Sequence, residues 1–143
     1  MGAWNEENFG NDDACDWVSL LVESRGTSVL LMPIDLVNTK QGYLESYECS
    51  EALAVAEVIA AALTNDYSCV PESIIKWLNE KPGFFARKPL IKNEYANMAR
   101  LAVEKIIGDS ELKELWQESD HYERWRYIQQ KLLAKLVDTH SRS

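Results

Sequence analysis

The chain has 143 residues, of which 46% are hydrophobic, and a formal net charge of −8 at pH 7. This length predicts one domain with a substantial core, and the apolar content excludes an intrinsically disordered chain. The acidic balance disfavours direct DNA or RNA binding, which usually needs a basic face.

The charge is divided unevenly along the chain. Residues 1–80 hold 14 Asp or Glu and 3 Lys or Arg, whereas residues 81–143 hold 9 and 12. Two interpretations follow from this division. Either the basic C-terminal elements pack beside the acidic N-terminal ones, or the acidic half presents a face to a basic partner.

The cysteines and the apolar stretches predict where the protein resides. The chain has three cysteines, Cys15, Cys49 and Cys69, an odd number without a C-x-x-C pair. We therefore expect each cysteine to be a small core residue of a protein in a reducing compartment. The first residues carry no signal-peptide pattern, and the longest apolar stretch, 52–63, is interrupted by Glu57. We therefore expect a cytoplasmic protein without a membrane span.

The first helix is expected after residue 10, with Asn11 or Asp12 as its N-cap and Gly26 as its end. Its predicted inward side chains are Trp17, Leu20, Leu21 and Ser24. Residues 27–38, TSVLLMPIDLVN, fit either a strand or a helix kinked at Pro33. We favour the helix, because no other segment offers a strand partner.

The strongest predicted helix is EALAVAEVIAAAL, residues 51–63, with Ser50 as its cap. Six of these thirteen residues are alanine, the best helix former. The segment is apolar nearly all round, which places it in the middle of the fold.

Further helices are predicted over 72–80 and 93–108, from 110 onward and over 122–137. The segment KPGFFARKP, residues 81–89, is predicted to be a basic loop. Together these elements predict an all-α fold, an irregular compact bundle of six or seven helices in a single domain spanning residues 1–143.

Asp12, Asp13 and Asp16 form a D-D-x-x-D pattern, a spacing with which helical enzymes hold magnesium. Such a site needs a second acidic cluster opposite the first, and no second motif of this kind is present; Glu57 and Glu94 are candidates for an opposing carboxylate. The alternative is structural, because acidic residues at a helix N-terminus are favoured by the macrodipole and by capping. We favour the structural interpretation and keep Asp12, Asp16 and Glu57 as candidate metal ligands.

Glu57 is unusual because alanine, valine and isoleucine surround it in the central helix. A buried carboxylate has to be paired, hydrogen-bonded or protonated. Arg100, a tryptophan N–H or loop backbone are the partners we expect.

No catalytic signature stands out in the chain. His121 and His140 have no second His or Cys nearby in the sequence, and no G-x-S-x-G or Gly-rich phosphate loop is present. No catalytic or cofactor-binding residue is therefore predicted. Trp4, in a segment that is usually frayed, suggests an N-terminus tucked against the body of the protein.

The opening residues resemble the start of an uncharacterised bacterial family, the domain of unknown function numbered 4259, whose members tend to begin M-G-A-W-G-x-G-x-F-x-N-D-x-A-x-D. The matching positions are Met1, Gly2, Ala3, Trp4, Phe9, Asn11, Asp12, Ala14 and Asp16. Residues 51–57 and 110–116 resemble it too, while Asn5 and Glu7 stand where the family tends to have glycine. The resemblance implies a stand-alone bacterial domain and no particular activity.

Two functional hypotheses follow. The first is a non-catalytic interaction protein whose acidic N-terminal half meets a basic protein partner, one version being an immunity-type protein that neutralises a basic toxin or nuclease. The alternative is a small magnesium- or manganese-dependent hydrolase of phosphate-containing substrates, with Asp12, Asp16 and Glu57 as ligands.

Overall fold

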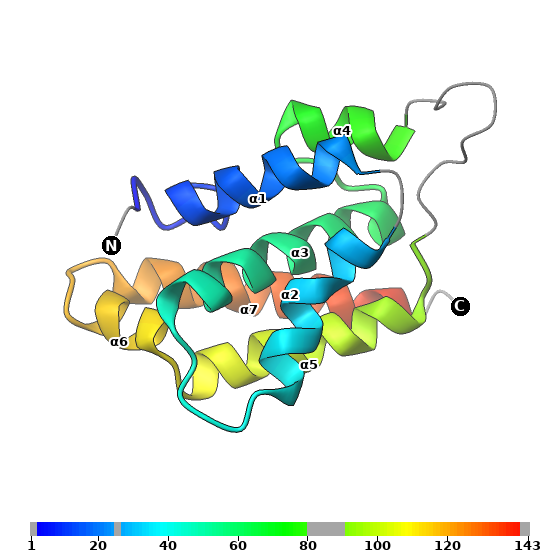
Figure 1. Cartoon of the computed structure of the whole chain (residues 1–143). Helices are drawn as coiled ribbons and strands as arrows, with labels where there is room; N and C mark the ends of the chain where they lie inside the picture. The colour runs from blue at the N-terminus through cyan, green and yellow to red at the C-terminus, as the bar shows by residue number, and fades with distance from the viewer. Residues whose placement is uncertain (1–2, 25–26, 80–90, 141–143) are drawn as a thin grey trace.

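Helices account for nearly all regular structure in the computed structural model, which describes residues 3–24, 27–79 and 91–140. The seven helices in these ranges are α1 (Asp12–Glu23), α2 (Ser28–Thr39), α3 (Ser46–Thr64), α4 (Glu72–Asn79), α5 (Glu94–Gly108), α6 (Glu111–Gln117) and α7 (Tyr122–His140) (Figure 1). Those residues contain no sheet, so the predicted all-α class is confirmed.

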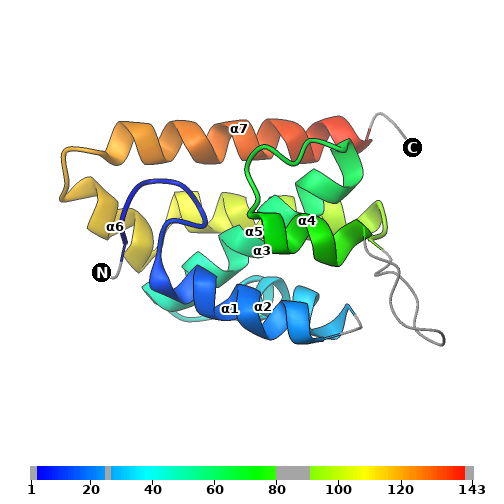
Figure 2. The ribbon, with the colours of Figure 1, turned by 90° about the horizontal axis from the view of Figure 1, so that it is seen from above.

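Helix α3 lies at the centre of the bundle. It packs against α1, α2, α5, α6 and α7, and its residues from Ala52 to Ala61 are all buried. Figure 2 shows α3 and α5 between α7 on one side and α1 with α2 on the other. The alanines explain this arrangement, because small side chains let several neighbouring helices approach one axis.

Helix α2 resolves the ambiguous segment. Residues 28–39 are helical with Pro33 inside, and Leu30, Ile34 and Val37 are fully buried against the core. The prediction of a helix is therefore confirmed. A strand would have left its backbone hydrogen bonds unmade, since the described residues offer no second strand.

The central helix begins earlier than predicted. It starts at Ser46, and Glu45 and Glu48 form a reciprocal capping box. The prediction that Ser50 caps it was wrong, because the Glu45–Glu48 pair already satisfies the free N–H groups one turn upstream. In α1, Leu20 is 61% exposed, so its predicted inward position was also wrong. Gly26 and the predicted loop 81–89 lie outside the described residues.

The N-terminal loop, residues 3–11, folds back on itself before α1. The backbone N–H of Trp4 donates to the carbonyl of Gly10 over 2.8 Å. A Cβ at residue 10 would lie 2.1 Å from Oδ1 of Asn5, so a larger residue there would require the Asn5 side chain to move. The Trp4 side chain is 64% exposed and does not anchor the loop.

A buried amide pair holds the loop against α7. Asn8 Nδ2 donates to Gln129 Oε1 over 3.0 Å, and Gln129 Nε2 donates back to Asn8 Oδ1 over 2.8 Å. Both residues are buried. The N-terminus is therefore tucked against the body as expected, although through Asn8. Within the described ranges, no helix is long and apolar enough to cross a membrane.

Replacing Gln129 with leucine is expected to lower the free energy of unfolding by about 1–3 kcal/mol, because the buried Asn8 amide loses its partner. Urea denaturation measures the difference. Gln130→Leu, at an exposed neighbouring position, is the control and should stay within about 0.5 kcal/mol of the unaltered chain. Equal losses in the two variants would contradict the anchoring role of the amide pair.

Candidate acidic interface

Three helix N-termini meet at one end of the bundle. Helices α3 and α6 are joined there, since Glu111 N–H donates to the Leu44 carbonyl over 2.9 Å and the Glu111 side chain accepts from Ser46 N–H over 2.8 Å. Helix α1 begins beside the start of α3 (Figure 1). Acidic first-turn residues are favoured at each N-terminus by the helix macrodipole. The result is a concentration of carboxylates from segments far apart in the sequence.

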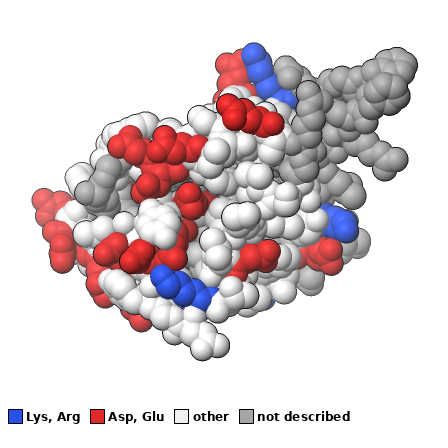
Figure 3. All heavy atoms as spheres, viewed as in Figure 1, with Lys and Arg blue, Asp and Glu red and all other residues white. Residues whose placement is uncertain are grey.

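We call this surface the acidic face. It is formed by Asp12 and Asp13 of α1, Glu48 and Glu51 of α3, and Glu111 and Glu114 of α6. Figure 3 shows that Asp and Glu side chains outnumber Lys and Arg on this side of the molecule. Lys40 is a basic residue there, and its Nζ lies 2.8 Å from Glu48 Oε2.

The negative charges on this face help to raise the pKa values of Glu51 and Tyr43. Partial burial raises the pKa of Glu51, and the nearby charges of Asp13 and Glu48 raise it further. Tyr43 donates a hydrogen bond to Glu114, and this bond, together with burial and surrounding carboxylates, raises the pKa of Tyr43 to about 12. The acidic face therefore carries negative charge that its own basic residues do not fully balance.

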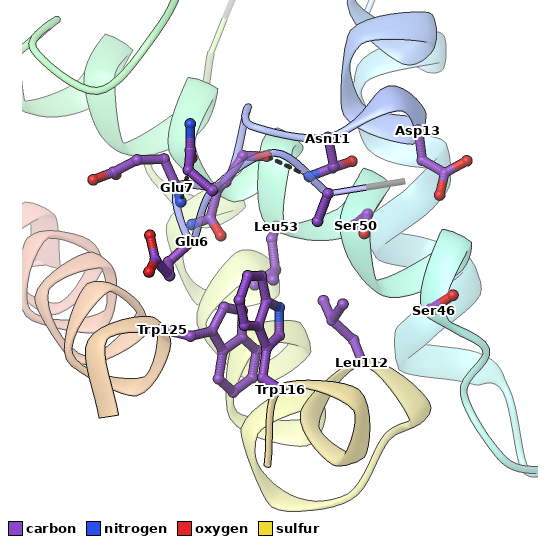
Figure 4. A pocket seen from close by; sticks show the side chains of 13 residues that line it. Glu6, Glu7, Asn11, Asp13, Ser46, Ser50, Leu53, Leu112, Trp116 and Trp125 are labelled. Atoms are coloured by element: carbon purple, nitrogen blue, oxygen red, sulfur yellow. Dashed lines mark hydrogen bonds between the residues drawn. The ribbon is translucent and has the colours of Figure 1, made fainter. Parts of the chain in front are cut away.

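A small pocket of about 110 Å³ opens beside this face. Trp116 and Trp125 both line it, and Figure 4 shows their indole rings on the opposite side from Glu6 of the N-terminal loop and Asp13 of α1. The Glu6 carboxylate also lies 2.9 Å from His121 Nδ1. Carboxylates around aromatic rings suit a cationic group, since both attract positive charge.

The structure does not bring the predicted metal ligands together. Asp12 and Asp16 are exposed on α1, and Asn11 Oδ1 accepts from Ala14 N–H over 2.8 Å as the N-cap. Glu57 is 4% exposed inside α3 and lines a different cavity. Among the residues that the structure describes, no three His, Cys, Asp or Glu side chains are grouped to hold one metal ion.

Glu57 is buried, and its neighbours are not the predicted ones. Burial raises its pKa to about 7, while the Lys135 ammonium and a hydrogen bond from Asn8 act in the opposite direction. Arg100, an expected partner, instead donates to Glu104 over 2.9 Å on the surface of α5. Neither Asn8 nor Lys135 carries a sequence signal that links it to Glu57.

The three cysteines occupy different environments. Cys49 is buried as predicted, and burial raises its pKa to about 11. Cys15 is half-buried, and burial with the charges of Asp12 and Asp16 raises its pKa. Cys69 is exposed in the loop between α3 and α4, so its predicted core position was wrong.

Replacing Asn11 with alanine is expected to destabilise the fold by about 1 kcal/mol through loss of the α1 cap. Thermal unfolding measures the change.

Magnesium at about 5 mM should leave the Tm of the unaltered chain unchanged, since only a ligand that binds the folded state raises it. A magnesium-dependent rise in Tm that Asp16→Asn abolishes would contradict the capping interpretation.

The raised pKa of Glu57 predicts a pH-dependent stability. Between about pH 4.5 and pH 7 the folded chain keeps a proton on Glu57 that the unfolded chain releases, so this group makes stability fall as the pH rises through that window. Glu57→Gln has no such group. The free energy of unfolding of this variant, minus that of the unaltered chain, should therefore increase between about pH 5 and pH 8, by at most about 3 kcal/mol. Urea denaturation at both pH values measures the difference, and a pH-independent difference would contradict the assignment.

Comparison with known proteins places the chain in a family. Residues 2–127 match the family model described as "Domain of unknown function (DUF4259)". The resemblance in the opening residues and in the two later segments is therefore confirmed. No curated protein and no solved structure matches the chain.

Proposed function

The chain belongs to the DUF4259 family, and we propose that it is a non-catalytic interaction protein that binds a basic protein partner through its acidic face. The observation that carries the proposal is that acidic residues of three helix N-termini gather on one surface, where repulsion by Asp13 and Glu48 adds to burial in raising the pKa of Glu51. Cations of a partner would relieve this repulsion on binding. Complementary charge also accelerates association and selects against acidic competitors.

Aromatic side chains on the same part of the surface support this proposal. Trp4, Tyr43 and Tyr47 are between 48% and 64% exposed. Tyrosine and tryptophan are enriched in protein interfaces, where they contribute large contact areas with little loss of side-chain entropy. Tyr43 and Tyr47 flank the start of α3, and Trp4 lies between two residues, Ala3 and Asn5, that line the pocket.

The pocket supplies a place for one basic side chain. Its volume of about 110 Å³ is small, Glu6 and Asp13 line it, and two tryptophan rings lie on the opposite side. A lysine or arginine of the partner would gain both ion pairing and a cation–π contact there. One version of this function is an immunity-type protein, in which the acidic face covers the basic surface of a toxin or nuclease.

The proposal is tested with a variant that removes three charges but leaves the capping box intact: Asp13→Asn, Glu51→Gln and Glu114→Gln. Immobilised unaltered protein is expected to retain a basic protein from native lysate at low salt and to release it as the salt concentration rises. The triple variant should bind that protein about tenfold more weakly, because charge complementarity is lost. Affinity measured with the recovered protein gives the comparison.

The matched control removes three exposed carboxylates from other elements: Glu72→Gln on α4, Glu94→Gln on α5 and Glu123→Gln on α7. It changes the net charge by the same amount, and its affinity should stay within about twofold of that of the unaltered chain. Equal retention by the two triple variants, or no basic protein retained at low salt, would overturn the proposal.

A further inference from the structure

A second and larger cavity, which we call the Glu57 cavity, lies along α7. Its volume is about 320 Å³, at the lower end of the range of roughly 300–1,000 Å³ typical of small-molecule sites. The N-terminal loop and the loop between α3 and α4 both run beside α7 in Figure 2, and both contribute to the lining. Glu57 reaches the cavity from α3.

Four of the charged groups in the lining form two ion pairs. Arg124 Nη2 lies 3.4 Å from Glu7 Oε1, which links α7 to the N-terminal loop. Lys135 Nζ lies 3.2 Å from Asp66 Oδ2, which links α7 to the loop after α3. These pairs leave the net charge of the cavity to its two remaining charged side chains, Glu57 and Lys131.

Lys131 contributes a cation that is not engaged in a salt bridge to a carboxylate. Its Nζ lies 5.5 Å from the centre of the Tyr127 ring, which is a cation–π contact, and no carboxylate of the described residues lies within ion-pair distance of it. Such a contact contributes only about 0.5–1 kcal/mol at an exposed site, so the ammonium can accept an anion as well.

Glu57 does not neutralise Lys131 fully near pH 7. Burial is the main cause of its raised pKa, and the charges of Glu7 and Asp66 act in the same direction, against Lys135. A protonated Glu57 can donate a hydrogen bond into the cavity, whereas an ionised one would repel an anion. The cavity is therefore more cationic when Glu57 carries its proton.

Apart from Ser68 and Cys69, the rest of the lining is aliphatic or aromatic. Ile128 and Leu132 lie one turn apart on the same face of α7 as Lys131, and Tyr127 adds an aromatic ring. This combination suits a ligand with one negative group and a hydrophobic body.

We propose that the Glu57 cavity is a binding site for a small organic carboxylate, with the carboxylate at Lys131 and the apolar body against Ile128 and Leu132. This site is separate from the acidic face, and it does not depend on the function proposed above. A charged hydrogen bond to Lys131 supplies the affinity, and the proton on Glu57 prevents repulsion.

The test uses sodium benzoate as the probe and benzamide as its uncharged analogue. Benzoate should bind with a Kd of about 1 mM or tighter at pH 6 in ligand-observed NMR, while benzamide binds at least about tenfold more weakly. Cys69 also lines the cavity and reports where the probe sits. Benzoate should slow iodoacetamide alkylation of Cys69 but leave the alkylation of Cys15 in α1 unchanged, as followed by peptide mass spectrometry at constant ionic strength.

Two variants locate the anion on α7. Lys131→Met should weaken benzoate binding about tenfold, whereas Arg126→Met, which removes an exposed cation outside the cavity lining, should not. From pH 6 to pH 8 binding to the unaltered chain should weaken about tenfold, since the fraction of binding-competent, protonated Glu57 falls. Glu57→Gln should remove this pH dependence.

Several results would overturn the proposal: no benzoate binding at pH 6, equal binding of benzamide, or binding that Lys131→Met leaves unchanged. Binding that does not protect Cys69 would place the probe elsewhere and would overturn it as well. Equal benzoate affinities of the unaltered chain at pH 6 and pH 8 would show that protonation of Glu57 does not control binding, which would overturn its role in the site. None of these results bears on the acidic face, whose residues tested above do not line this cavity.

Discussion

The burial of α3 on nearly every side is the constraint on which the rest of the structure depends. Five helices pack against this one, and its alanines keep their axes close. Any polar group in such a helix has to be accommodated by its neighbours. Glu57 is that group, and it is accommodated where the N-terminal loop, α7 and the loop after α3 meet. The packing of the core and the chemistry of the larger cavity therefore have the same origin.

The acidic face has a different origin, in the polarity of helices. The first turns of α1, α3 and α6 each carry acidic residues, which suits the positive end of a helix dipole. Each helix taken alone gains stability from them. Where these ends lie together, burial raises the pKa of Glu51, and the charges of Asp13 and Glu48 raise it further. An arrangement that is favourable for each helix thus gathers negative charge on one surface of the protein.

Local signals accounted for much of the fold. Helical spacing and capping residues predicted a helix for each of the seven observed ones, although α3 begins five residues before the predicted start at Glu51. The lack of a strand partner favoured a helix over residues 27–38, where α2 lies. The errors occurred where two local signals competed. Ser50 is a good cap, yet the Glu45–Glu48 box lies one turn earlier and determines the start of α3. Cys69 has apolar neighbours in sequence, but its loop runs over the surface.

The sequence by itself determined which segments are helical, which helix is central, and that a carboxylate interrupts it. These properties depend on residues a few positions apart, so periodicity and capping reveal them. Only the tertiary structure decided what surrounds that carboxylate. Asn8 and Gln129 meet across 121 positions of sequence, and Lys135 approaches Glu57 from another helix. Such contacts depend on how the helices pack, so they cannot be inferred from the spacing of residues along the sequence.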